Sequence, residues 1–216
     1  MAVLTSPAFR TGGNFGSPKL DLGGCVLYLP LWRPDLAGSP FQSPSPYGIP
    51  THLATVTGAL WTPQGRKCDG IDDVIHVPDH ASLKFGTGQF TVGFWGMTSA
   101  SHPGGGVYPI WFSKEDEVAA RKGWTMYQSS ATSLAVFEVF GDTQESVNSS
   151  FAMNDGIWHL YVGVKGASTI ELFRDNAISL GTDTAPAGST DKAIQVNIGG
   201  NDGAYRWSSG TIGECF

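Results

Sequence analysis

The chain has 216 residues, of which 41% are hydrophobic and only 15% are charged, so it can bury a large core and does not belong to the disordered class. Its net charge is -6 without any cluster of Lys or Arg, which argues against nucleic-acid binding and binding to anionic membranes. No apolar run approaches the roughly 20 residues that span a bilayer, so membrane insertion is not expected.

The N-terminal part of the chain combines an irregular arm with the start of a β-rich domain. Closely spaced Gly, Pro, Ser and Thr predict an arm at residues 1–22, and a single domain is expected at residues 23–216. The arm does not resemble a secretory signal. The first predicted strand covers residues 26–32, where Pro30 favours a sheet edge or a bulge. Five prolines then predict a long loop at residues 33–50.

Short β-prone runs continue to the end of the chain, at the spacing typical of a sandwich or barrel. They cover residues 54–61, 74–77, 90–95, 107–112, 124–128, 134–140, 158–164, 169–174, 194–198 and 210–216. One helical turn is expected near residues 79–83, and no longer stretch has helical periodicity. The sequence therefore predicts an all-β fold of two antiparallel sheets packed face to face.

The three cysteines do not form a disulfide framework. Cys25, Cys68 and Cys215 lie in apolar surroundings, and their spacing is not that of a metal site. Buried free thiols are the favoured interpretation, and a Cys25–Cys215 bridge with Cys68 left over is the alternative.

An acid-rich turn at residues 69–73 separates two β-prone segments. Asp69, Asp72 and Asp73 supply three carboxylates beside Gly70. The turn could hold a metal ion, or its carboxylates could simply be solvated.

Several motifs, in their order along the chain, resemble the strands of laminin-G-like, concanavalin A-like jelly rolls. They are Cys68-Asp-Gly-Ile-Asp-Asp-Val-Ile-His-Val77, Phe90-Thr-Val-Gly-Phe-Trp95, Asn154-Asp-Gly-Ile-Trp-His-Leu-Tyr-Val162, Glu171-Leu-Phe-Arg-Asp-Asn176, and Val196-Asn-Ile-Gly-Gly200 with Gly210-Thr-Ile-Gly-Glu-Cys-Phe216. Each motif is weak alone, but together they cover about residues 25–216. The resemblance implies a two-sheet antiparallel jelly-roll sandwich. This chain departs from the family pattern in ending soon after Glu214 and in carrying no visible signal.

The resemblance implies a binding protein rather than an enzyme, and many relatives hold a structural Ca²⁺ near one rim. Ca²⁺ takes six to eight oxygen ligands. The positions that match are Asp69, Asp72 and Glu214, and Asp35 in the long loop is an outside candidate. The alternative is that Asp69 caps its turn and the other carboxylates are solvated.

Aromatic side chains are the second functional clue, because sugars stack their apolar faces on Trp and Tyr. The glycan-binding candidates are Tyr108, Trp111, Trp124, Tyr127, Tyr205 and Trp207. The alternative is that they belong to the core, since alternation alone does not identify the solvent face. Trp95 and Trp158 are assigned to the core.

The sequence gives little support for an enzymatic function. Paired carboxylates on alternate strand residues, as jelly-roll glycoside hydrolases use, are not found. Glu115 to Glu117 is interpreted as a charged bend, and Glu138 has no second carboxylate two residues away. His76 and His80 are interpreted as strand or surface residues. A hydrolase or lyase with an unrecognised site is the least favoured alternative.

Three functional hypotheses follow. The first is a lectin-like structural or adhesion protein, such as a virion decoration or fibre component, with the arm anchoring it to neighbouring subunits. The second is a carbohydrate-binding module of a secreted system, and the third is the enzyme. The expected partners are glycans or neighbouring protein subunits, including a homo-oligomer, and the expected location is extracellular or on a virion surface.

Overall fold

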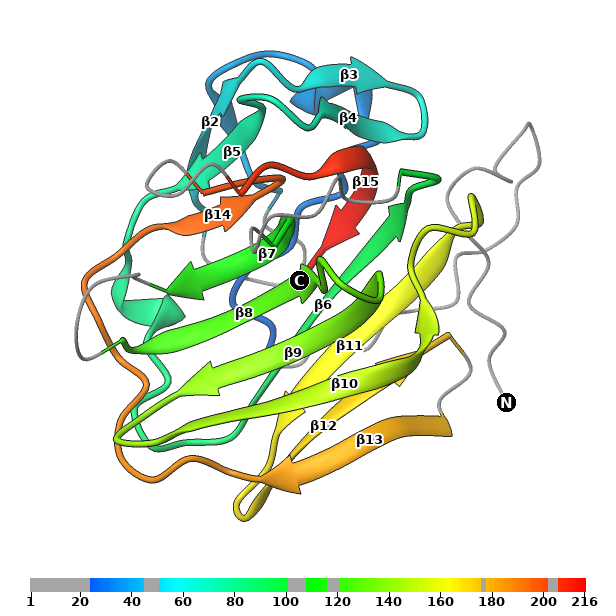
Figure 1. The fold of residues 1–216 in the computed structure, drawn as a ribbon. Helices are drawn as coiled ribbons and strands as arrows, with labels where there is room; N and C mark the ends of the chain where they lie inside the picture. The colour runs from blue at the N-terminus through cyan, green and yellow to red at the C-terminus, as the bar shows by residue number, and fades with distance from the viewer. Residues whose placement is uncertain (1–23, 45–50, 101–107, 116–120, 176–177, 202–205) are drawn as a thin grey trace.

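The computed structural model describes residues 24–44, 51–100, 108–115, 121–175, 178–201 and 206–216. They form two antiparallel sheets packed face to face (Figure 1). The expected all-β fold is confirmed. The predicted arm at residues 1–22 lies outside the described residues. Neither short 3₁₀ helix in the described part of the chain could span a bilayer.

The larger sheet has eight strands in the order β1-β2-β5-β14-β7-β8-β9-β10. Their bounds are Phe41–Gln42 (β1), Leu53–Thr57 (β2), Val74–Val77 (β5), Val196–Ile198 (β14), Ile110–Glu115 (β7), Gly123–Gln128 (β8), Leu134–Phe140 (β9) and Gln144–Ala152 (β10).

The smaller sheet has seven strands in the order β13-β12-β11-β6-β15-β4-β3. Their bounds are Ile178–Thr184 (β13), Thr169–Arg174 (β12), His159–Lys165 (β11), Phe90–Met97 (β6), Ser209–Cys215 (β15), Gly65–Asp69 (β4) and Leu60–Thr62 (β3). The 3₁₀ helices are η2 at Pro34–Leu36 and η4 at Ala81–Leu83, the second of which confirms the expected turn.

Some of the strand predictions need correction. Residues 54–61, expected as one β-prone run, divide into β2 of the larger sheet and β3 of the smaller sheet. Residues 26–32 do not form a strand, and only Leu29 makes a β-bridge, to Cys215. Pro30 explains this, because it has no N–H to continue a ladder. Strand β10 was not predicted, because most of its residues are polar; they pair along β9. The three cysteines are free, as the favoured interpretation predicted.

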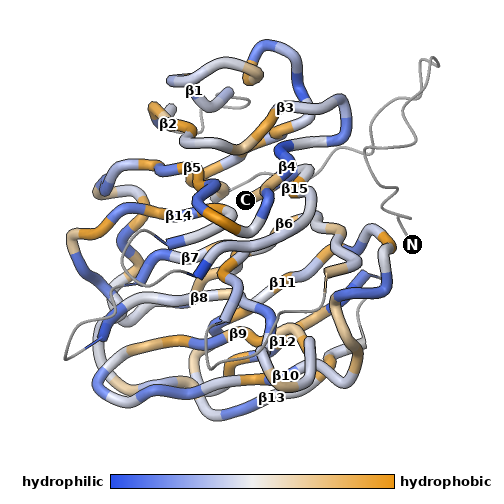
Figure 2. The backbone as a smooth tube through the Cα atoms, turned by 45° about the horizontal axis from the view of Figure 1, so that its top comes forward, coloured by the Kyte–Doolittle hydropathy of each residue, from blue (hydrophilic) through white to orange (hydrophobic). Residues whose placement is uncertain are grey.

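The core lies between the sheets and is rich in aromatic rings. Phe94 of β6 stacks on Trp111 of β7 at 5.8 Å between ring centroids and on Tyr161 of β11 at 5.3 Å. A Cβ atom added to Gly163 of β11 would lie 2.6 Å from the ring of Phe137 in β9, so the two sheets approach closely at this point. Hydropathy varies along the strands, and many hydrophilic stretches lie in the connections at their ends (Figure 2).

Arg66 of β4 ties three separate backbone segments together. It is buried, and its guanidinium donates to the carbonyl oxygens of Leu36 at 2.5 Å, Gly38 at 2.7 Å and Ala59 at 3.1 Å. These carbonyls belong to the long proline-rich loop and to the turn before β3. Arg66 therefore fixes that loop to the smaller sheet.

Replacing Arg66 with Met should lower the free energy of unfolding by about 2–4 kcal/mol, because three carbonyl groups lose a charged donor. Urea denaturation measures the loss. Arg33→Met is the matched control, because Arg33 pairs with Asp35 at the surface and such pairs contribute less than about 1 kcal/mol. Equal losses in the two variants would contradict the role given to Arg66.

Candidate functional site

A row of polar side chains crosses the outer face of the larger sheet. Trp124 and Met126 of β8 belong to the core, so Thr125 between them faces outward, because side chains alternate along a strand. Residues paired directly opposite one another share a face. Following the pairs through Thr125 gives one residue from each of seven strands. This polar row consists of Thr55, His76, Asn197, Ser113, Thr125, Glu138 and Ser146.

The middle of the polar row is buried although it faces away from the core. Ser113 and Thr125 are 0% and 1% exposed, and neither hydroxyl oxygen has a hydrogen-bond partner among the described residues. Buried polar groups are nearly always satisfied by protein, water or ligand. At one side of them, His76 Nδ1 lies 2.8 Å from Asn197 Oδ1. The outer face is thus a built polar surface rather than a second hydrophobic layer.

Two arginines meet one glutamate beside the row. The side chain of Glu115, the last residue of β7, is fully buried. Arg121 donates from Nε to Glu115 Oε2 at 3.0 Å and from Nη2 to the same oxygen, while Arg206 Nη1 lies 3.9 Å from Oε1. The guanidinium of Arg121 also lies over the ring of Phe140, 3.9 Å from its centroid. These contacts hold both guanidinium groups at the outer face.

Two tyrosines adjoin these cations. The ring centroids of Tyr108 and Tyr127 are 5.0 Å apart, and the guanidinium carbon of Arg206 lies 5.7 Å from the centroid of Tyr108. Both tyrosines are half-buried. Burial, followed by the charge of Glu138, raises the pKa of Tyr127, so its hydroxyl stays protonated and can donate a hydrogen bond at neutral pH.

Glu138 is the carboxylate of the polar row itself. It is 7% exposed, and Gln144 Nε2 donates to its Oε1 at 2.5 Å. Burial raises the pKa of Glu138 and outweighs the opposing effects of the Gln144 hydrogen bond and of Arg121 and Arg206. Glu115 and Glu138 therefore lie on the same face in different environments.

The structure separates the six predicted glycan-binding aromatics into three groups. Tyr108 and Tyr127 lie together beside the polar row. Trp207 is half-buried and packs against Gly200, where an added Cβ atom would lie 2.0 Å from its ring. Tyr205 lies outside the described residues. Trp111 and Trp124 form the third group, which needs correction.

Trp111 and Trp124 are core residues, only 1% and 3% exposed, so they do not offer a surface to a sugar. Trp124 alternates inward from Thr125. Trp111 is directed inward by a register shift between Ile110 and Phe112, which brings consecutive residues of β7 into the core. Trp158 was assigned to the core, but its side chain is only half-buried.

Four charged residues at this face were not among the predicted site residues: Glu115, Arg121, Glu138 and Arg206. Glu115 was assigned to a charged bend, whereas β7 extends to include it. Glu138 interrupts the otherwise apolar run of β9, and that isolated charge is the signal that could have indicated an outward-facing site. Arg121 and Arg206 come from loops, so only the tertiary structure brings them to this face.

The acid-rich turn places Asp69, Asp72 and Asp73 together, with their ligand atoms within 4.8 Å of one another. Asp69 Oδ1 accepts from the Ile71 N–H and Asp73 Oδ2 accepts from the Asp69 N–H, both at 2.8 Å. Burial raises the pKa of Asp73, which is the one buried member of the three. Oxygens at 2.3–2.6 Å from one Ca²⁺ lie at most about 5 Å apart, so the spacing fits a calcium ion.

Two predicted metal ligands are not part of this group. Asp35 pairs instead with Arg33, whose Nε and Nη2 lie 2.9 and 2.8 Å from its carboxylate oxygens. Asp69 pairs with Ser209 in β15, and Glu214 lies five residues further along that strand, about 16 Å away at the usual rise per residue. Asp73 is the member that the prediction omitted.

Comparison with known proteins shows the fold and no closer relationship. No model of a known protein family matches the chain, and no curated protein does. The binding domain of Paraclostridial Mosquitocidal Protein 1 has a TM-score of 0.56 and 11% identity, covering 76% of this chain and 42% of that one. Domain 4 of AbnA, a GH43 extracellular arabinanase from Geobacillus stearothermophilus solved with arabinotriose, has a TM-score of 0.52 and 12% identity, covering 82% and 74%.

Mouse laminin α1 domains LG4-5 have a TM-score of 0.50 and 15% identity, covering 69% of this chain and 39% of that one. The chain thus spans less than half the length of the laminin and mosquitocidal chains. The fold is a jelly-roll β-sandwich of the concanavalin A-like, laminin-G-like kind, as the sequence motifs predicted.

The burial of Glu138 predicts a pH dependence of stability. Its pKa is raised above the ordinary 4.5, so the native state keeps the proton to higher pH than the unfolded chain does. Stability should therefore fall as the pH rises from about 4.5 through the raised pKa. Glu138→Gln should remove that fall while keeping an oxygen for Gln144. Urea denaturation from pH 4 to 8 measures it, and Glu171→Gln on the other sheet controls for the lost charge. An unchanged pH slope in Glu138→Gln would contradict this account.

Proposed function

We propose that this protein is a non-catalytic, lectin-like β-sandwich that binds glycans on the outer face of its larger sheet. The observation that carries the proposal is the group of half-buried aromatic and cationic side chains beside the polar row, namely Tyr108, Tyr127, Arg121 and Arg206. Sugar hydroxyls match such a polar surface, and sugar rings stack on aromatic faces. The AbnA domain, whose structure contains arabinotriose, supports the proposal as a protein of the same fold.

Half-buried groups around the row are the proposed contacts. Tyr108 and Tyr127 offer ring surface, Arg121 and Arg206 offer N–H donors, and Gln144 is exposed at the far side of Glu138. Ser113 and Thr125 form the floor beneath them. This arrangement combines a few oriented polar groups with aromatic surface, which is typical of small-molecule sites.

Tyr108→Ala should weaken glycan binding about ten-fold, because it removes one stacking surface, whereas Tyr108→Phe should retain most of the affinity. A glycan array followed by affinity electrophoresis on the best ligand measures the change. Phe151→Ala is the matched control. Phe151 is an exposed aromatic residue far from Tyr108 in the sequence, and the guanidinium of Arg174 lies over its ring. Equal losses in Tyr108→Ala and Phe151→Ala would place the site elsewhere, and binding of no glycan by the native chain would refute the proposed function.

The pair Glu115 and Glu138 supports a second candidate function, a glycosidase. Glu138 has a raised pKa, as a general acid requires, while Glu115 lies between two guanidinium groups. Release of reducing sugar from a bound oligosaccharide, abolished in Glu138→Gln while binding persists, would favour the enzyme. Binding without turnover would favour the lectin-like protein.

We propose an extracellular or virion-surface setting for this binding activity, with neighbouring subunits of the same chain as partners. The predicted N-terminal arm at residues 1–22, which could contact neighbouring subunits, motivates this setting. Light scattering of the purified chain tests it: a stable trimer or larger assembly would favour a structural component of a surface, and a monomer would favour an isolated carbohydrate-binding module.

We further propose that Asp69, Asp72 and Asp73 bind a structural Ca²⁺ that rigidifies the rim of the sandwich. Their spacing fits the ion, and backbone or water oxygens must complete its six to eight ligands. Asp69 and Asp73 already order the turn through hydrogen bonds to its backbone, so the ion would bind a partly formed site.

Saturating Ca²⁺ should raise the melting temperature by roughly 5–10 °C over EDTA, because a ligand bound only by the native state stabilises it. Asp72→Asn should abolish the shift while leaving in place the hydrogen bonds that Asp69 and Asp73 accept from the turn backbone. Asp35→Asn and Glu214→Gln should keep the full shift. Identical melting curves in Ca²⁺ and EDTA would show that the carboxylates serve only the turn.

A further inference from the structure

The charged groups of the proposed glycan site carry an excess of positive charge at mildly acidic pH. Arg121 and Arg206 adjoin the same buried carboxylate, that of Glu115. The other acidic group is Glu138, whose pKa is raised above its ordinary 4.5 by burial. Below that raised pKa, Glu138 is neutral. Among these four residues, two guanidinium groups are then balanced by one carboxylate, which leaves one positive charge for a ligand to neutralise.

Arg121 also has hydrogen-bond donors left over that are open to solvent. Its Nε and Nη2 both donate to Glu115 Oε2. Its Nη1 makes no hydrogen bond to a described residue and is not buried, and 26% of the side chain is exposed. The guanidinium lies over the ring of Phe140, 3.9 Å from its centroid. These contacts hold the cation in place while Nη1 remains available to a ligand.

The groups around Arg121 donate hydrogen bonds rather than accept them. Burial raises the pKa of Tyr127, so its hydroxyl keeps its proton. A protonated Glu138 is a donor as well, and Arg206, whose side chain is 21% exposed, offers only N–H groups. A ligand that matches this surface must therefore supply acceptors. A carboxylate supplies two acceptor oxygens and no proton.

We infer that the site selects acidic sugars and binds the carboxylate of a uronic acid against Arg121 and Arg206. This inference rests on the proposed glycan-binding function and names its substrate class. The guanidinium carbon of Arg206 lies 5.7 Å from the ring centroid of Tyr108, so a cation and a stacking surface are close together. Hydrogen bonds between a guanidinium and a carboxylate are roughly twice as strong as neutral ones. The acidic group therefore supplies specificity, and the aromatic ring supplies contact area.

The experiment titrates the full chain calorimetrically at pH 5 with oligomers of galacturonic, mannuronic and glucuronic acid, each beside its carboxyl-reduced, neutral form. At least one acidic oligomer should bind about ten-fold more tightly than its neutral counterpart. Equal affinity, or preference for the neutral form, would refute the acidic class while leaving glycan binding in place. Binding of neither form in any pair would also refute the acidic class, and a glycan array then decides the proposed function separately.

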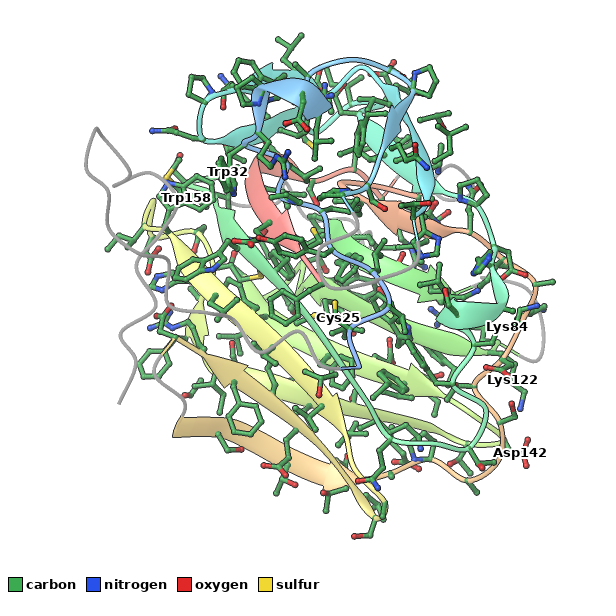
Figure 3. All side chains as sticks on the ribbon, turned by 180° about the vertical axis from the view of Figure 1, so that it is seen from behind. Cys25, Trp32, Lys84, Lys122, Asp142 and Trp158 are labelled. Atoms are coloured by element: carbon green, nitrogen blue, oxygen red, sulfur yellow. The ribbon has the colours of Figure 1, made fainter. Side chains whose placement is uncertain are left out.

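Lys122 supplies a matched control, because it follows Arg121 in the chain but has an acidic partner of its own. Its Nζ donates to Asp142 Oδ1 at 2.7 Å, and Figure 3 shows both residues at one edge of the molecule. Arg121→Gln should remove most of the preference for the acidic form, whereas Lys122→Gln should retain it. Equal losses would attribute the preference to the general charge of the protein and would overturn the site. A thermal melt checks that both variants are folded.

Glu138 provides a second test that leaves both arginines in place and holds even if Arg121→Gln does not fold. Gln144, Arg121 and Arg206 act on its carboxyl group. Above the raised pKa the charge of Glu138 repels the carboxylate of the ligand, so affinity for the acidic form should fall from pH 5 to pH 8. Glu138→Gln should bind that form equally at both values. A fall of the same size in the variant would contradict the inference.

Discussion

The packing of the two inner sheet faces against each other is the constraint on which the rest of the structure depends. Phe94 of β6 lies between Trp111 of β7 and Tyr161 of β11, so one aromatic stack joins the two sheets. Because strand side chains alternate, fixing which residues enter this core also fixes which ones face outward. The packing of the core therefore determines which side chains form the outer surface.

Strand β8 shows how this constraint separates the chemistry of the two faces of the larger sheet. Trp124 packs into the core between the sheets, while Thr125 and Tyr127 face the polar row and its arginines. The inner face is apolar and rich in aromatic rings, whereas the outer face combines hydroxyl, carboxylate and guanidinium groups. Alternation along a single strand thus keeps the two kinds of side chain apart.

Much of the fold could be predicted from the sequence because its signals are local. Short β-prone runs, turn residues and the motifs at residues 68–77 and 154–162 identified the antiparallel jelly roll. The misses have physical causes that a pattern does not show. The polar residues of β10 form a strand because they pair with β9. The register shift in β7 directs Trp111 into the core, where alternation alone could not place it.

The sequence by itself determined that this is an all-β chain with an acidic turn and an aromatic-rich interior, because composition and short-range spacing carry that information. It also supplied Tyr108, Tyr127, Asp69 and Asp72 as candidates. Only the tertiary structure decided which of them share a site, because strand pairing joins residues far apart in the chain. Asn197 and Ser113, which are neighbours in the polar row, meet only through the pairing of β14 with β7.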